Sequence, residues 1–264
     1  MNGRIAQGFA RRLSSYDAAA IAQTQIAARL AKWVKPLVSP GSRILELGHG
    51  TGLFTHHLAR LSPDEVWLND LIAPLPMIRW PAASRIHAAG GDAAGLRFPD
   101  RLDLIASTSM LQWLDNPRAL LGKAATALRA DGILAVTSFG PDNFPELGAA
   151  GLTDGAPSYR DAAGLCRDLP DSMTVIAAWD EDIPVIFPNA QALFAHLRAT
   201  GVNGLMAGQL SVPRLRALMA QMNRQGTITL TYRPSYCIAA KSCALSRHSP
   251  LKGGLSCPSR PRLS

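Results

Sequence analysis

The residues best suited to chemistry are one acid and three glycines at alternate positions, Glu46, Gly48, Gly50 and Gly52. Apolar residues flank the acid, and an apolar pattern with helical spacing begins at Leu53. This order predicts a buried strand that runs into a glycine-rich turn at the N-terminus of a helix. Glycines in such a turn let the backbone approach a ligand closely, and the exposed N–H groups favour electron-rich atoms. The carboxylate of Glu46 at the strand end suits a cationic ligand and not a pyrophosphate.

The spacing of the glycines separates two kinds of cofactor site. A dinucleotide fingerprint, Gly-x-Gly-x-x-Gly, would need a glycine at position 53, where the chain has Leu53. The pattern here is Glu-x-Gly-x-Gly-x-Gly. It resembles the first motif of class I S-adenosylmethionine (SAM) methyltransferases, whose cofactor carries an ammonium and a sulfonium group. A tight turn with a purely structural role is the alternative interpretation of the same glycines.

Two further acids follow later predicted strands. Asp70 ends the apolar run at 66–69 and lies 20 residues after Gly50. In nucleotide-binding α/β folds, an acid at that place accepts hydrogen bonds from ribose hydroxyls. Asp92 and Ala93 follow a third apolar stretch, and the methyltransferase resemblance implies that this acid reaches the adenine amino group. Each acid alone could be a helix cap or a surface turn residue, but three acids at successive strand ends favour a cofactor site.

Strands and helices alternate along the first half of the chain. Asn116 and Pro117 form a cap followed by a proline at the first turn of a helix, and the prolines at 74 and 76 predict an irregular or short crossover. The alternation predicts an α/β fold with a doubly wound, mostly parallel seven-stranded sheet, which places ligands at the carboxyl ends of the strands. Strands are expected near 43–47, 65–69, 84–88, 102–107 and 132–138, and helices near 52–60 and 117–129.

The remaining segments predict a lid, an insertion and a tail around this domain. Residues 1–40 form a helical lid with a helix near 17–38, residues 41–241 form the main domain, and 242–264 form a basic, disordered tail. A substrate-side insertion covers about 140–225. Two closing strand segments follow it, at 228–232 and 236–241, one of them antiparallel to the rest. Within or beside the insertion we expect a helix near 158–168, a strand near 173–178, and helices near 190–200 and 212–224, capped by Asn189 and Ser211.

Composition bounds the class of protein. A chain of 264 residues, with 47% hydrophobic and 17% charged residues, can bury a sizeable core as an ordinary globular protein. Its longest apolar stretches fall short of a membrane span, and its N-terminus lacks the apolar core of a secretory signal. The four cysteines have no metal-ligand spacing, so we expect reduced thiols in a cytoplasmic protein and no metal site.

The basic residues are concentrated in the last third of the chain. Residues 1–182 carry 17 basic and 19 acidic side chains, whereas residues 183–264 carry ten basic side chains and no acidic one. This asymmetry indicates an anionic partner, which could be a nucleic acid, a membrane surface or an acidic protein. Four of the ten basic residues belong to the predicted tail, and solvated charges in that tail are the alternative explanation for them.

Several segments together resemble one branch of the SAM methyltransferases, the malonyl-acyl-carrier-protein O-methyltransferases of biotin synthesis. The most specific are Leu111-Gln112-Trp113 and the run His-Leu-Arg-Ala-Thr-Gly-Val-Asn at 196–203. His49 departs from the family, which usually has cysteine at this place in the glycine turn. The resemblance covers roughly residues 4–241, and its other matching segments lie at 9–17, 103–107, 138–141, 146–147 and 230–232.

The resemblance implies methylation of the free carboxylate of a malonyl thioester, carried by an acidic acyl-carrier protein or by coenzyme A. The cofactor would be SAM and its product S-adenosylhomocysteine (SAH), without a metal. A carboxylate is already ionised and nucleophilic at neutral pH, so the reaction needs no general base. The protein must instead align the carboxylate oxygen with the bond between sulfur and the methyl group in a site poor in water.

The resemblance also implies a role for individual residues. Glu46 with the three glycines surrounds the methionine part, Asp70 holds the ribose, Asp92 and Ala93 hold the adenine, and Ser107 faces the sulfonium. For catalysis, Tyr16 on the lid would close over the methyl group, and Arg198 would orient the malonyl carboxylate by a bidentate pair. A tyrosine that only covers the N-terminal helix and an exposed helical arginine are the structural alternatives. The basic residues proposed to attract the carrier protein are Arg214, Arg216 and Arg224.

Three other functions remain open from the sequence. The chain also resembles assembly factors of respiratory complex I, which include a branch that modifies a partner protein. A methyltransferase of a small free carboxylic acid would fit the same motifs. A nucleic-acid methyltransferase would account for the basic third, but the chain has no Asn-Pro-Pro-Tyr motif and no interleaving of aromatic and basic residues that would stack bases. We therefore expect neither a nucleic acid nor a membrane as partner.

Overall fold

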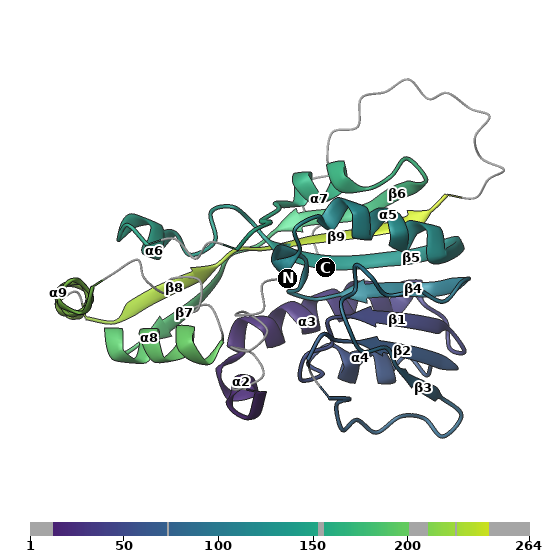
Figure 1. Ribbon diagram of the computed structural model, residues 1–264, viewed down its shortest axis with the longest axis horizontal. Coiled ribbons are helices and arrows are strands. Elements are labelled where there is room, and N and C mark those ends of the chain that lie inside the picture. The colour runs from purple at the N-terminus through teal and green to yellow at the C-terminus, as the bar shows by residue number, and fades with distance from the viewer. Residues whose placement is uncertain (1–12, 73, 153–155, 201–210, 225, 243–264) are drawn as a thin grey trace.

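The computed structural model describes residues 13–72, 74–152, 156–200, 211–224 and 226–242. At its centre is a seven-stranded sheet with the order β3-β2-β1-β4-β5-β9-β6 (Figure 1). The first five strands in this order, from β3 to β5, are parallel to one another. Strand β9 runs antiparallel to both β5 and β6. The predicted α/β fold with a mostly parallel seven-stranded sheet is thus confirmed. The strands of this sheet are β1 (Arg43–Leu47), β2 (Glu65–Asn69), β3 (Arg85–Ala88), β4 (Leu102–Ser107), β5 (Leu128–Phe139), β6 (Met173–Asp180) and β9 (Pro234–Lys241).

Helices cover both faces of the sheet, because successive residues of each buried strand point to opposite faces. Ile44 of β1 belongs to the apolar cluster that contains Ile26 and Leu58 of two covering helices. The next residue, Leu45, belongs to the cluster of the other face, which contains Leu121. The helices are α2 (Leu13–Ala19), α3 (Ile21–Val34), α4 (Thr55–Ala59), α5 (Pro117–Ala127), α6 (Pro145–Ala149), α7 (Ala162–Asp168), α8 (Ala190–Ala199) and α9 (Val212–Asn223), with the 3-10 helices η1 (Lys35–Leu37) and η2 (Leu111–Trp113).

Most predicted elements are present with shifted ends. The helix expected at 52–60 is only α4, because the chain from 50 to 54 is still in the turn and Gly52 has a φ of 96°. The strand expected at 132–138 begins already at Leu128, directly after α5. The N-terminal helix expected at 17–38 is divided into α2, α3 and η1. As predicted, the described part of the crossover between β2 and β3 is irregular, with turns and bends in place of a regular element.

The insertion contains a strand that the sequence did not lead us to expect, β7 (Ile183–Phe187). It pairs antiparallel with β8 (Ile228–Tyr232) in a separate two-stranded sheet. With α6, α8 and α9, these strands form an arm that extends to the left of the main sheet in Figure 1. The core is continuous into this arm, since Leu193 and Tyr232 belong to the same apolar cluster as Ile26 of α3. The arm is therefore packed against the main domain.

Some predictions fall outside the described residues. They concern residues 1–12 of the lid, the part of the 196–203 segment after position 200, and the tail from 243 onward. Within the described ranges, no helix is both long and apolar enough to cross a membrane. In the same ranges, no group of three or more histidine, cysteine or acidic side chains is arranged to hold a metal ion.

The two predicted helix caps of the arm differ. The Asn189 side chain accepts a hydrogen bond from the Ala192 N–H at 2.9 Å and caps α8 as predicted. Ser211 stands at the cap position of α9, but its side chain makes no capping hydrogen bond. The predicted position of Ser211 is thus confirmed, but the capping hydrogen bond is not formed.

We predict that Asn189→Ala lowers the free energy of unfolding by about 1 kcal/mol, the usual value for the loss of a capping hydrogen bond. The matched variant Ser211→Ala should change it by less than about 0.5 kcal/mol, since it removes no such bond. Urea denaturation of the two variants and the unchanged protein measures both values. Equal losses for the two variants would contradict the assignment.

One carboxyl group, that of Glu46, is buried inside the sheet layer. Its side chain is 1% exposed and lies on the face of β1 that packs against α3 and α4. Its Oε2 atom has no hydrogen-bond partner among the described residues. Burial raises the pKa of Glu46 to about 8; the neighbouring Thr55 side chain lowers it, and the charge of Asp70 raises it further. Glu46 therefore keeps its proton in the folded protein well above the pH at which a solvated carboxyl group loses it.

This burial predicts a pH dependence of stability. The unfolded chain loses the Glu46 proton near its ordinary pKa of 4.5, whereas the folded protein keeps it up to a pKa of about 8. The free energy of unfolding should therefore fall, by a few kcal/mol in total, as the pH rises between these values. Glu46→Gln should remove this part of the decline. Urea denaturation from pH 5 to 8 provides the test, and parallel curves for both proteins would contradict it.

Candidate active site

A large cavity opens at the carboxyl ends of β1, β2, β4 and β5. It lies beside the point where the strand order reverses between β1 and β4. Ligands of open α/β sheets bind at such reversal points. The cavity contains about 1370 Å³ of empty space, part of it open to solvent.

The glycine loop shapes one wall of this cavity, which Gly48 and Gly50 line directly. Gly48, Gly50 and Gly52 all have positive φ angles, of 70°, 55° and 96°. A side chain at Gly48 would come within 2.6 Å of Met110, and one at Gly52 within 2.7 Å of Pro76. A side chain at Gly50 would meet no described atom within 4 Å. Gly48 and Gly52 are thus required for packing, whereas Gly50 leaves free space where a ligand can approach.

Asn69, at the end of β2, fastens the glycine loop to the neighbouring strand ends. Its backbone oxygen accepts hydrogen bonds from the Gly48 and His49 N–H groups, at 2.8 and 2.9 Å. Its side-chain amide donates to the backbone oxygens of Ala89 and Gly91, at 2.6 and 2.8 Å. This role of Asn69 was not predicted, because the only signal in the sequence is a polar side chain at the end of an apolar strand.

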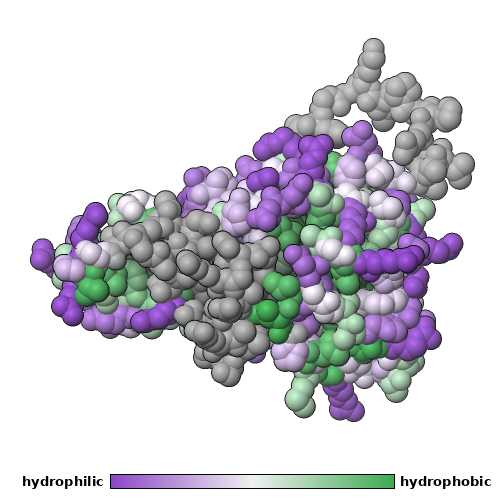
Figure 2. Space-filling view, in the orientation of Figure 1, coloured by the Kyte–Doolittle hydropathy of each residue, from purple (hydrophilic) through white to green (hydrophobic). Residues whose placement is uncertain are grey.

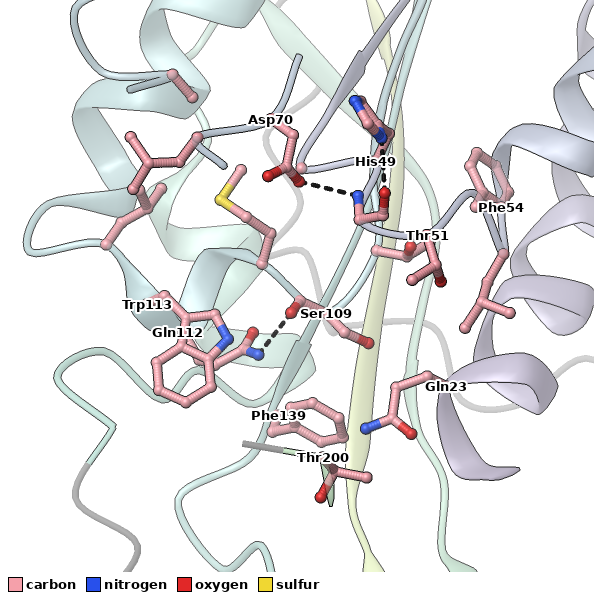
Figure 3. Close-up of a pocket in the computed structure, with 18 of the residues that line it drawn as sticks. Gln23, His49, Thr51, Phe54, Asp70, Ser109, Gln112, Trp113, Phe139 and Thr200 are labelled. Atoms are coloured by element: carbon pink, nitrogen blue, oxygen red, sulfur yellow. Dashed lines mark hydrogen bonds between the residues drawn. The ribbon is translucent and has the colours of Figure 1, made fainter. Parts of the chain in front are cut away.

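Two of the predicted acids lie at the cavity. Asp70 accepts a hydrogen bond from the Gly50 N–H through Oδ2 at 2.9 Å (Figure 3). Its Oδ1 accepts from the Ile72 N–H, also at 2.9 Å. Asp92 is exposed, and its Oδ1 accepts from the Ala94 N–H at 3.0 Å. Ala93, which follows Asp92 in the same turn, is buried and also lines the cavity. The acids therefore approach the cavity from two neighbouring strand ends.

Three other predicted residues lie behind the cavity wall. Glu46, Gly52 and Ser107 are buried and are not among the residues that line the cavity. The Ser107 hydroxyl donates to the backbone oxygen of Leu47 at 2.9 Å and so links β4 to β1. Glu46 lies beneath the glycine loop, close enough for the charge of Asp70 to affect it.

The two predicted catalytic residues are in different places. Tyr16 of α2 lines the cavity, and burial raises the pKa of its phenol, with a further increase from Asp17. Arg198 is exposed on α8 and is not part of the lining. Sequence reasoning missed other polar residues here: Gln23 of α3, Thr200 after α8 and Tyr232 of β8 also line the cavity. In Figure 3, Gln23 and Thr200 lie at the end of the cavity opposite Asp70.

The loop after β4 forms the floor between these two ends. The Ser109 N–H donates to the Thr137 hydroxyl of β5 at 2.9 Å. The side-chain amide of Gln112, in η2, donates to the backbone oxygen of Ser109 at 2.7 Å (Figure 3). The specific Leu111-Gln112-Trp113 motif thus includes a residue that holds a cavity loop in place.

The chain matches known methyltransferases along most of its length. The methyltransferase-domain family matches residues 20–200. A malonyl-[acyl-carrier protein] O-methyltransferase of Bacteroides thetaiotaomicron is 33% identical over 258 residues, which cover 90% of this chain and 97% of that protein. Proteins of the same name from Acinetobacter baylyi and Haemophilus influenzae are 32% and 30% identical; each alignment covers 90% of this chain, and 96% and 94% of those proteins.

Solved structures agree on the fold. Two proteins, from Bacillus halodurans and Bacillus subtilis, have TM-scores of 0.55 and 0.54 to this chain at 13% and 12% identity. Each comparison covers 82% of this chain and all of the other. At such identities the likeness concerns the fold alone. The sequence relatives and the family match go further, and by them the chain belongs to the class I methyltransferases, in the family of the malonyl-[acyl-carrier protein] O-methyltransferases.

Proposed function

We propose that this protein transfers a methyl group from SAM to the free carboxylate of a malonyl group carried by an acyl-carrier protein. The main support is the likeness, over nine-tenths of the chain, to proteins named for that reaction. The methyl ester would mask the charge of the malonyl group, so that fatty-acid enzymes could extend it toward the precursor of biotin.

The residues around the glycine loop fit SAM. The open space at Gly50 admits a ligand close to the backbone. Glu46 lies below the loop with an unpartnered buried oxygen, and it would support the cationic methionine part from behind the cavity wall once it has lost its proton. Asp70 would hold the ribose, and Asp92 with Ala93 the adenine. We place the sulfonium near the end of β4, where Ser107 supports the neighbouring strand.

The reaction requires the protein mainly to position the two reacting groups. SAM supplies, when bound, a methyl group made electrophilic by a positively charged sulfur. The malonyl carboxylate is already ionised at neutral pH, so no residue needs to remove a proton. Apolar side chains such as Phe139 and Phe144, which line the cavity, would exclude water and strengthen the charge interactions inside. Tyr16 would close the cavity from the lid.

The arm offers a surface for an acidic carrier protein. Arg214, Arg216 and Arg224 are exposed on or next to α9. Hydrophilic side chains cover much of the end of the arm in Figure 2, where α9 lies. The absence of acidic residues after position 182 leaves the positive charge of this region uncompensated within its own segment. We propose that these charges speed the encounter with the carrier protein. Arg198, exposed nearby on α8, stays a predicted contact of the malonyl group.

Loss of the Asp70 carboxylate should weaken cofactor binding. We expect Asp70→Ala to raise the Kd for SAH by about tenfold or more, because hydrogen bonds to a charged acceptor contribute roughly 1.5–3 kcal/mol. Titration calorimetry with the folded protein measures this affinity. The matched variant Asp171→Ala, which removes an exposed acid outside the cavity lining, should leave it unchanged. An unaltered Kd for Asp70→Ala would exclude Asp70 as a cofactor ligand.

The reaction itself can be tested by mass spectrometry. Malonyl-carrier protein incubated with SAM and this protein should gain one methyl group, and mild alkaline hydrolysis should remove it, because the product is an ester. Acetyl-carrier protein, which has no free carboxylate, serves as the control and should remain unchanged. Parallel reactions with malonyl-coenzyme A and free malonate identify the carrier. Absence of methylation on every malonyl compound would refute the proposed function.

A further inference from the structure

Neutral polar side chains converge on the end of the cavity opposite the acids. Tyr16 comes from α2, Gln23 from α3, Thr200 from the end of α8, and Tyr232 from β8. All four line the cavity, and none carries a formal charge. Gln23 and Thr200 are buried, and the Gln23 Oε1 atom has no hydrogen-bond partner among the described residues. Polar atoms brought together from separate elements in a buried place indicate a site for a polar group of a ligand.

Tyr232 is at the centre of this cluster. Its side chain is 1% exposed, and its hydroxyl lies 2.6 Å from Nε2 of the buried His196. Burial raises the pKa of Tyr232, and so does the neighbouring Tyr16, whereas the nearby side chains of Thr200 and Gln23 lower it; the net shift is upward. Burial lowers the pKa of His196. At neutral pH the phenol therefore keeps its proton and the imidazole is uncharged.

The backbone on both sides of Tyr232 is held by one short segment before and within α6. Both carboxylate oxygens of Glu146 accept from Thr231, one from its N–H at 2.9 Å and the other from its hydroxyl at 2.6 Å. The Arg233 N–H donates to the Asn143 side chain at 3.0 Å. In addition, the ring of Phe144 packs edge-on against the Tyr232 ring, with the centroids 4.7 Å apart. These contacts fix the direction in which the phenol points.

We propose that the Tyr232 hydroxyl donates a hydrogen bond to the carboxylate of the substrate and that His196 positions it for this task. The proposal rests on the proposed function and names the part of the site that recognises the malonyl group. Two arrangements of protons are compatible with the contact between Tyr232 and His196. In the one that an incoming carboxylate selects, His196 Nε2–H donates to the Tyr232 oxygen, which leaves the phenol proton to point into the cavity.

A neutral donor suits a carboxylate that must also react. In the transfer, a bond forms between a carboxylate oxygen and the methyl carbon, the bond from that carbon to sulfur breaks, and its electron pair stays on sulfur. No proton moves, so Tyr232 keeps its own throughout. A hydrogen bond is roughly twice as strong when its donor or its acceptor is ionised, so a neutral phenol can already hold the carboxylate. A cationic donor would add a full positive charge that stabilises the anion further and makes it less nucleophilic. A phenol orients the carboxylate with less loss of nucleophilicity.

The variant Tyr232→Phe tests this assignment because it removes only the hydroxyl. We expect the KM for malonyl-carrier protein to rise about tenfold or more, with kcat changed by less than about threefold, as for an interaction present before and during transfer. Acetyl-carrier protein lacks the carboxylate, so its inhibition constant should be the same for both proteins. Tyr236→Phe is the matched control: this tyrosine is fully buried in β9 and stacked on Trp179, outside the cavity lining.

The role of His196 is tested by a double-mutant cycle. His196→Phe keeps an aromatic ring against Phe187 and should also raise the KM for malonyl-carrier protein. The double variant with Tyr232→Phe should have no higher KM than Tyr232→Phe alone, because both changes interrupt the same chain of hydrogen bonds. The affinity for SAH reports folding of every variant, and His196→Phe alone serves if Tyr232→Phe does not fold. Turnover by the unchanged protein together with an unaltered KM in these variants would refute the inference while the proposed function stands. No turnover by the unchanged protein would refute both.

Discussion

The cavity depends on one buried amide, that of Asn69. Its backbone oxygen holds the start of the glycine loop, and its side chain holds the turn that follows β3. Because these two segments come from different strands, their relative position is set by the geometry of a single residue between them. The Gly91 N–H completes the connection by donating to the backbone oxygen of Asp70 at 3.0 Å. The loops that we propose to surround the cofactor thus form one unit attached to the rigid edge of the sheet.

The two ends of the cavity differ in charge, and the difference matches the two proposed ligands. Carboxyl groups approach from the strand ends, where a cationic cofactor would lie. The other end presents phenol, amide and hydroxyl groups that would receive an anion. This second end is built jointly by the lid helices and the arm, with Asp17 of α2 also accepting a hydrogen bond from Thr51 of the glycine loop. This hydrogen bond joins the predicted lid directly to the cofactor end.

Sequence alone predicted the parts whose signals are local. The glycine pattern, the alternation of apolar residues in β1, and the caps Asn116 and Asn189 all depend on neighbours along the chain, and the structure has them in place. The resemblance to malonyl-carrier-protein methyltransferases is likewise confirmed by the sequence relatives. Contacts between distant segments were not predictable. Asn69 acts on a turn 22 residues away, and His196 meets a tyrosine 36 residues away. Strand β7 was not predicted either. Its alternating residues stand next to prolines, in a segment whose sequence indicates helices and loops.

The position of β9 in the sheet has a consequence for synthesis on the ribosome. This strand is the last of the described strands in the chain, yet it lies between β5 and β6 and pairs with both. Until it emerges, β6 has no partner in the main sheet and β5 presents an open edge, which is prone to wrong pairing. The parallel half from β1 to β5 can form earlier, since its pairings are complete without β9. In a nascent chain, the cofactor end of the cavity can therefore form first. The opposite end is completed only when the arm and the last strand have folded.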